Sequence, residues 1–123
     1  GELFSVNNAT VRSVDSLFAR NERFVSLFET ELGLMANIMV GAFFVGSMQT
    51  VWLGQITPAK KREIVIKEYK DEDISLEQGQ EFGNFNMGST VILIFEKDKL
   101  KWLEELKAGD GIEVGQILGK VNS

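Results

Sequence analysis

The dipeptide Gly88-Ser89, in the run Met87-Gly88-Ser89-Thr90, has the residue types needed for self-cleavage of a backbone. A serine that follows glycine in a tight turn can attack the preceding carbonyl, because glycine has no side chain in the way and accepts unusual backbone angles. The resulting ester breaks by β-elimination, and the new terminal residue loses ammonia to become a pyruvoyl group. Such a carbonyl forms a Schiff base with an amine and accepts electrons. Ser89 is therefore the candidate nucleophile and cofactor precursor.

The same dipeptide also fits an ordinary turn. Glycine and serine are common turn residues, and the apolar run Thr90–Phe95 that follows is typical of a strand. Taken alone, Gly88-Ser89 favours this structural interpretation, so the chemical one needs support from the rest of the chain.

Composition restricts which other groups could take part in chemistry. The chain has 123 residues, 44% apolar and 25% charged, which suits one globular domain with a core. It contains neither cysteine nor histidine, which excludes thiolate nucleophiles, disulfides and the commonest general base and metal ligand. We expect no metal site. A net charge of −5 without a basic block argues against binding to nucleic acid.

Short apolar runs separated by single glycines predict a mostly β fold. Val91–Phe95 is apolar on both faces and rich in β-branched residues, so we expect it deep in the core. Leu34–Leu53 is apolar, but polar residues and glycines interrupt it, and we interpret it as two strands rather than a membrane span. The predicted strands are Leu3–Val6, Phe24–Glu29, Met35–Val40, Phe43–Val51, Glu63–Tyr69, Thr90–Phe95 and Gln116–Val121.

Two short helices are predicted. Val14–Ala19 fits a single short helix. Asp98–Lys107 is the stronger prediction, because three leucines recur at helical spacing between lysines and glutamates and Gly109 follows as a natural end. We predict a surface helix there, without chemistry.

Gly109–Gly119 resembles the turn-and-strand pattern of biotinyl and lipoyl carrier domains and of sugar-phosphotransfer carriers. No lysine stands at a suitable hairpin tip, so this resemblance supports a fold and not a carrier function. The predicted fold is a compact flattened β-barrel or sandwich that resembles carrier-type barrels, with one or two short helices. Lys60-Lys61-Arg62 and Lys70–Asp73 are interpreted as solvated turns, and a membrane contact of the basic triplet stays open.

Several segments outside the Gly-Ser dipeptide carry, in combination, the signatures of one enzyme family. They are Gly1-Glu2-Leu3-Phe4-Ser5-Val6-Asn7, Leu17-Phe18-Ala19-Arg20-Asn21-Glu22-Arg23, Val40-Gly41-Ala42 with Val45-Gly46-Ser47-Met48, Thr50-Val51-Trp52 with Gly54 and Ile56-Thr57-Pro58, and Gly79-Gln80-Glu81-Phe82-Gly83 with Phe85. Across essentially its whole length the chain resembles phosphatidylserine decarboxylase of the bacterial or mitochondrial proenzyme type. Met87 stands where the family usually has leucine, a volume-conserving difference.

The resemblance implies an enzyme that cleaves itself between Gly88 and Ser89 and carries a covalent pyruvate, the pyruvoyl group made from Ser89. Its implied activity is decarboxylation of phosphatidylserine to phosphatidylethanolamine in phospholipid biosynthesis. Residues 1–88 would end the β-chain, and residues 89–123 would form the α-chain of a heterodimer. The resemblance further implies membrane association through segments N-terminal to this chain, at the cytoplasmic face of a bacterial inner membrane. A homodimer stays open.

Other residues have two interpretations each. By the resemblance, Phe4, Ser5 and Val6 would line the substrate pocket, but the alternation of Phe4 and Val6 equally fits a core strand. The polar link Arg20–Arg23 fits a structural turn with a buried ion pair, or recognition of a lipid headgroup. Trp52 is expected in the core and Trp102 at the surface.

The complete absence of histidine conflicts with activity of this chain by itself. The family's self-cleavage uses an aspartate and a histidine upstream of the matching segment, and a further histidine serves decarboxylation. We therefore expect residues 1–123 to be a single C-terminal fragment of the catalytic domain. A noncatalytic carrier-like β-barrel binding module stays open as an alternative. A pyruvoyl enzyme for a soluble amino acid is a third hypothesis, which the motifs beyond Gly88-Ser89 disfavour.

We predict that the 123-residue chain alone stays uncleaved and inactive, because it has the serine but no histidine to accept its proton. Intact mass spectrometry should show a single chain of unaltered mass. Two chains separated at Gly88–Ser89, one with the mass of a pyruvoyl terminus, would contradict the need for the absent base.

Overall fold

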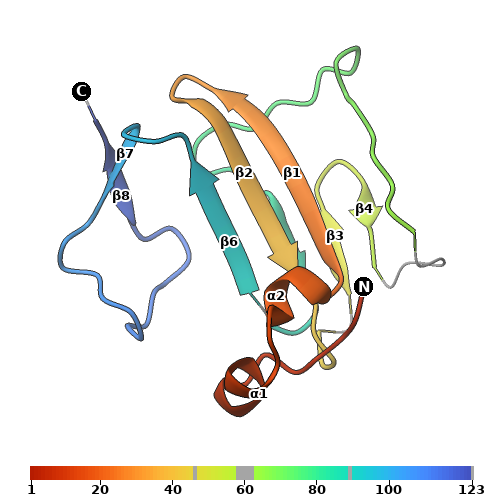
Figure 1. The fold of residues 1–123 in the computed structure, drawn as a ribbon. Coiled ribbons are helices and arrows are strands. Elements are labelled where there is room, and N and C mark those ends of the chain that lie inside the picture. Colours follow the sequence, from red (N-terminus) through yellow and green to blue (C-terminus); the bar gives the residue numbers. More distant parts are fainter. Residues whose placement is uncertain (46, 58–62, 89, 123) are drawn as a thin grey trace. The chain divides into compact units, whose positions relative to one another are not determined.

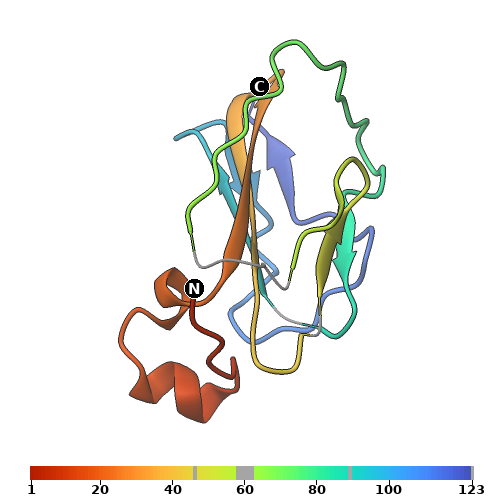
Figure 2. The ribbon, with the colours of Figure 1, turned by 90° about the vertical axis from the view of Figure 1, so that its right-hand side faces the viewer.

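The computed structural model describes residues 1–45, 47–57, 63–88 and 90–122. The chain divides into two compact units. The first combines Gly1–Phe24 with Ile38–Val91, and the second combines Val25–Asn37 with Ile92–Ser123. Figures 1 and 2 follow the chain from two directions, and both show the two helices close to the N-terminus.

The described part of the chain is mostly β, as predicted, with two short helices. Its elements are α1 (Asn8–Ser13), α2 (Leu17–Arg20), β1 (Arg23–Thr30), β2 (Gly33–Val40), β3 (Met48–Thr50), β4 (Gly54–Gln55), β5 (Gly83–Phe85), β6 (Thr90–Phe95), β7 (Leu100–Trp102) and β8 (Gly119–Val121). The strands form small sheets with the orders β1-β2-β6, β4-β3-β5 and β7-β8. Closure into a barrel or sandwich stays a prediction.

Three predicted strands are present in full, as β1, β2 and β6. Two are present only in part, because β3 and β8 are 3-residue strands inside longer predicted segments. The predicted strand Leu3–Val6 is wrong, since the side chain of Asn21 takes both backbone groups of Phe4 and leaves them unavailable to a sheet. The predicted strand Glu63–Tyr69 is also wrong. Its three consecutive apolar side chains, Ile64, Val65 and Ile66, are 93%, 79% and 85% exposed, and the segment pairs with no described strand.

The predicted helix Asp98–Lys107 is wrong, because strand pairing replaces it. Leu100 pairs with Val121, and Trp102 pairs with Gly119, in an antiparallel ladder. Asp98 has a φ of 62°, which no right-handed helix accommodates. The Trp102 ring also packs edge-on against Phe95, with 5.9 Å between ring centroids. Tertiary pairing thus overrides a helical pattern of leucines.

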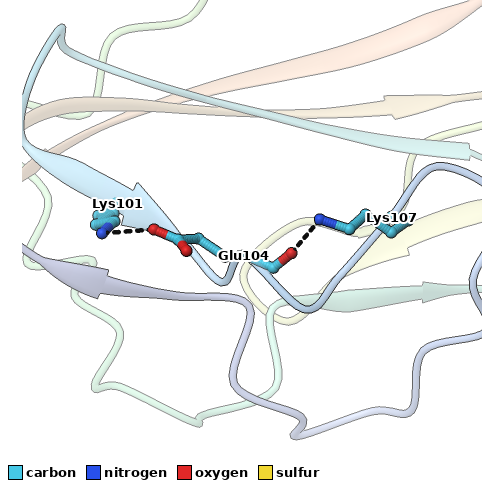
Figure 3. A network of polar contacts seen from close by, with 3 residues as sticks. All are labelled: Lys101, Glu104 and Lys107. Carbon is cyan, nitrogen blue, oxygen red and sulfur yellow. Dashed lines mark hydrogen bonds and ion pairs between the residues drawn. The ribbon is translucent and has the colours of Figure 1, made fainter.

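The charged residues of that segment form a small surface network, which Figure 3 shows. The Lys101 ammonium lies 2.8 Å from a Glu104 carboxylate oxygen, and Lys107 donates to the Glu104 backbone carbonyl. Both partners of the ion pair are more than half exposed, so it contributes little to stability.

The N-terminal helices differ from the single predicted helix Val14–Ala19. Ser16 has a φ of 54° and separates α1 from α2, so only the end of the predicted segment is helical. Helix α1 was not predicted. Its signal is Asn7, whose side chain accepts from the Thr10 amide as an N-cap, 2.9 Å away.

Burial of the apolar strands differs from the expectation in one respect. Strand β6 was expected deep in the core, but Val91 is 49% and Ile94 is 52% exposed. The reason is that β6 stands at the edge of its sheet. Trp102 is half exposed, as expected for a surface residue. No helix in the described ranges is long and apolar enough to cross a membrane.

The core of the first unit lies around Met48, which is fully buried. Met39, Ala42 and Val45 complete its buried cluster, and partly buried side chains pack against it, namely Val6, Phe24, Phe82 and Phe85. Trp52 belongs to the same unit, and its ring meets Phe82 edge-on at 5.1 Å between centroids. The expectation that Trp52 packs in the core agrees with these contacts.

Pairing of β3 with β5 joins two distant segments over this core. Met48 pairs with Phe85, and Thr50 pairs with Gly83. At Gly83 the strands approach so closely that an added Cβ would lie 2.2 Å from the Gln49 carbonyl oxygen. Only glycine fits there, because any side chain would push the two backbones apart.

We predict that Gly83→Ala destabilises the protein by about 1–3 kcal/mol, the usual cost of forcing extra volume into a packed site. The matched control is Gly111→Ala, where an added Cβ would meet nothing within 4 Å, and where a change below about 0.5 kcal/mol is expected. Urea unfolding midpoints check both variants. Equal midpoints would contradict the close approach of β3 and β5.

Candidate active site

The dipeptide Gly88-Ser89 lies on the connection between β5 and β6 (Figure 1). Ser89 itself is outside the described residues, so its side chain has no stated position. The surroundings of Gly88 are open, because a Cβ added there would meet no atom within 4 Å. Met87, immediately before it, is 58% exposed. The predicted cleavage site thus follows an exposed segment with room around the glycine.

The backbone that leads to Gly88 is held on buried residues. The Asn86 amide donates to the Ser47 carbonyl at 3.0 Å, and the Met87 amide donates to the Val45 carbonyl at 3.1 Å. Val45 is 3% and Ser47 is 6% exposed. The chain is therefore anchored to the core up to one residue before the glycine.

The three predicted pocket residues are consecutive in the chain and make different contacts. Phe4 carries the Arg20 guanidinium over its ring at 4.7 Å from the centroid. The Ser5 hydroxyl accepts from the backbone and side-chain nitrogens of Asn7. Val6 packs against the core cluster that contains Val45. This supports the core interpretation for Val6 and brings it to the cluster that also anchors Met87, and the pocket role stays a prediction.

Asn21 ties the N-terminal segment to the turn that follows β2. It is 0% exposed, and its side chain accepts from the Phe4 amide and donates to the carbonyls of Phe4 and Gly41, over 2.8 to 3.0 Å. The Arg23 guanidinium donates to backbone carbonyls of Ala19 and Asn21. These contacts support a structural turn at Arg20–Arg23, but Arg20 and Arg23 are exposed, so the buried polar group is the Asn21 amide and not the predicted ion pair.

Sequence reasoning missed the roles of Asn21, Ser47 and Asn86. All three use side-chain amides or hydroxyls to join segments that lie far apart along the chain. Neither residue type nor spacing shows which distant backbone group such a side chain will meet. The only available signal was their position within the signature segments or close to Gly88-Ser89.

Hollows near this region are small. One of about 90 Å³ lies beside Val45, well below the roughly 300–1,000 Å³ of typical small-molecule pockets. It is lined by Leu3, Glu22, Gly41, Ala42, Phe43, Val45 and Thr57. Within the described ranges, no group of three acidic side chains is placed to hold a metal ion.

Two charged segments after β4 are predicted to be solvated turns. Lys60-Lys61-Arg62 lies outside the described residues, so its membrane contact is not addressed. Lys70–Asp73 is exposed, as predicted for a solvated turn. Lys70 pairs with Glu68 at 3.0 Å, between side chains that are more than two-thirds exposed, where ion pairs contribute little.

Comparison with known proteins matches residues 1–120 to the family model described as phosphatidylserine decarboxylase. The chain belongs to the phosphatidylserine decarboxylase family. It is 52% identical over 122 residues to a phosphatidylserine decarboxylase proenzyme of Nitrosococcus oceani, covering 98% of this chain and 40% of that protein. A proenzyme of the same name from Pseudomonas fluorescens is 48% identical over 126 residues, covering 100% of this chain and 44% of that protein.

A third such proenzyme, from Coxiella burnetii, is 48% identical over 122 residues, with 99% of this chain and 43% of that protein covered. The chain thus spans about two-fifths of the length of these phosphatidylserine decarboxylase relatives. The family match confirms the resemblance inferred from the signature segments.

We predict that Asn21→Ala lowers the free energy of unfolding by on the order of 3 kcal/mol. The substitution removes the hydrogen-bond partner of buried backbone groups of Phe4 and Gly41. The control is Asn84→Ala, an exposed asparagine bonded to Gln49 and Glu81 side chains, for which a loss below about 1 kcal/mol is expected. Urea unfolding checks both. Similar losses in the two variants would contradict a special role of the Asn21 amide.

Proposed function

We propose that the protein containing this chain is a pyruvoyl-dependent phosphatidylserine decarboxylase, a carboxy-lyase that forms phosphatidylethanolamine in phospholipid biosynthesis. The family match over residues 1–120 carries this proposal. Two further features support it. Gly88-Ser89 lies on a connection whose leading backbone is anchored to buried residues, and the space around Gly88 is open.

In the proposed self-cleavage, the Ser89 hydroxyl oxygen attacks the Gly88 carbonyl carbon. The carbon–oxygen bond forms as the peptide carbon–nitrogen bond breaks, and a base takes the hydroxyl proton and gives a proton to the released amine nitrogen. Loss of the Ser89 α-proton then expels the Gly88 carboxylate and leaves dehydroalanine. Its tautomer takes up water and releases ammonia. The β-chain thus ends at Gly88, and the α-chain begins with the pyruvoyl group.

Glycine at position 88 suits this chemistry for two physical reasons. Glycine itself has no side chain beside its carbonyl and accepts unusual backbone angles, and among the described residues a Cβ added at Gly88 would meet nothing within 4 Å. The anchored amides of Asn86 and Met87 restrict the motion of the segment that carries this carbonyl. Reduced freedom before the reaction lowers the entropic part of its barrier.

The cofactor proposed is covalent pyruvate derived from Ser89. When formed, it supplies a ketone that condenses with the substrate amine and takes up the electron pair released as carbon dioxide leaves. We place Phe4, Ser5 and Val6 at the substrate pocket. Their support is that Val6 contacts the core cluster that anchors Met87.

The proton acceptors are proposed to lie in the part of the longer relatives that this chain does not span. The chain holds no histidine, and neutral-pH proton transfer commonly uses one. An aspartate and histidine supplied there would complete the cleavage site.

The proposed substrate also suggests a location and a fuller fold. Phosphatidylserine resides in a bilayer, so we place the whole protein at a membrane, on the cytoplasmic face of a bacterial inner membrane. We further propose that the strands close into a flattened barrel or sandwich in the whole protein. The half-exposed apolar side chains of β6 support this, because an apolar edge strand is usually paired with or covered by another segment. A noncatalytic carrier-like module is not favoured by the family match.

We predict that Ser89→Ala in the full-length protein abolishes both chain cleavage and decarboxylation, because it removes the nucleophile and the cofactor precursor together. Denaturing gels should show only the uncleaved chain, and labelled phosphatidylserine should release no carbon dioxide. The matched control is Ser75→Ala, at an exposed serine in the same unit, for which normal cleavage and activity are expected. Cleavage or activity in Ser89→Ala would overturn the proposed function.

A further inference from the structure

The regular pairing of β3 with β5 ends beside the proposed cleavage site. The ladder runs from Thr50 paired with Gly83 to Met48 paired with Phe85, and the Asn86 amide still donates to the Ser47 carbonyl. In a continuing antiparallel ladder the Ser47 amide would donate back to Asn86. It donates instead to the Val45 carbonyl at 2.8 Å. The backbone ladder is therefore half broken at Asn86.

A side-chain hydrogen bond between Asn86 and Ser47 is present where the backbone hydrogen bond from the Ser47 amide is missing. The Asn86 side-chain nitrogen donates to the Ser47 hydroxyl oxygen at 2.6 Å. Ser47 is 6% exposed and directly precedes the fully buried Met48. One end of this bond is thus fixed in the core, and the other lies two residues before Gly88.

The Val45 carbonyl gives the same segment a second fixed point. It accepts from both the Ser47 amide and the Met87 amide, at 2.8 and 3.1 Å. With the Met87 amide held, only the two backbone angles of Met87 and the two of Gly88 remain between a fixed atom and the scissile bond. A small displacement of Asn86 therefore carries over directly to the Gly88 carbonyl.

We propose that Ser47 and Asn86 are positioning residues for self-cleavage, which hold the backbone so that the Gly88 carbonyl is presented to the Ser89 hydroxyl. This inference rests on the proposed function. The bond replaces a lost ladder interaction only at the end of the strand pair, so its removal leaves the pairs from Met48–Phe85 to Thr50–Gly83 in place. The effect is on reaction geometry, where a displacement of about 1 Å can cost on the order of 100-fold in rate.

The chain offers a closely matched control in Asn84. It is the same residue type on the same side of β5, and its side chain also bonds across to β3, accepting from Gln49 at 2.7 Å. It differs in its partner, because Gln49 is not part of the segment that anchors Met87. A general effect of losing a cross-strand asparagine would therefore appear in both variants.

The test follows precursor cleavage in the full-length protein after pulse-labelled synthesis. Asn86→Ala and Ser47→Ala are each expected to slow cleavage at Gly88–Ser89 about ten-fold or more, while Asn84→Ala cleaves at the wild-type rate. The double variant of Ser47 and Asn86 should be no slower than either single variant, since both remove one bond. Asn86→Asp should restore much of the rate, because the Ser47 hydroxyl can donate to a carboxylate.

Stability is measured in the cleavage-blocked Ser89→Ala background, so that all chains compared are uncut. There, Asn86→Ala should leave the unfolding midpoint near that of Asn84→Ala. A midpoint as low as that of Gly83→Ala would assign the bond a structural role and overturn the proposal. Wild-type cleavage rates in Asn86→Ala, or equal slowing in Asn84→Ala, would overturn it too while leaving the proposed function intact. If the wild-type protein is not cleaved between Gly88 and Ser89, or if the Ser89→Ala variant is still cleaved there, the result contradicts the proposed function itself.

Discussion

The pairing of β3 with β5 over buried Met48 is the constraint on which the first unit depends. These strands are far apart along the chain, and they meet so closely at Gly83 that no side chain can stand there. Met48 is fully buried at the middle of the unit's apolar cluster. Because the two backbones are fixed against each other here, the positions of the residues just beyond the strand ends, such as Ser47 and Asn86, are restricted too.

The segment that leads to the proposed cleavage site is held by the same placement. The amides just before Gly88 are bonded to carbonyls of buried Val45 and Ser47, whereas the glycine has open space around it. A rigid support next to an unobstructed carbonyl is what an intramolecular attack requires, since the attacking group gains most from a restricted partner. The N-terminal segment joins the same support through Asn21 and Val6.

The chain divides the chemistry in an unusual way. It contains the proposed nucleophile and electrophile side by side in sequence, yet no histidine to move the proton between them. Members of the family that match it are more than twice as long. In the proposed mechanism the scissile bond and its base lie on different segments, so that cleavage depends on folding to bring them together.

Residue types and motifs alone determined the family, the mostly β class, strands β1, β2 and β6, and the Gly88-Ser89 dipeptide, because these depend on local pattern and on chemistry between neighbours. Tertiary structure alone decided that Leu100–Trp102, inside the predicted helix, pairs with β8, that the backbone of Phe4 is bonded to Asn21 instead of a sheet, and that Asn86 meets Ser47. Each of these depends on a partner many residues away. A hydrogen-bonding group accepts whichever distant partner the core delivers, and no local pattern of apolar or polar residues records which one that will be.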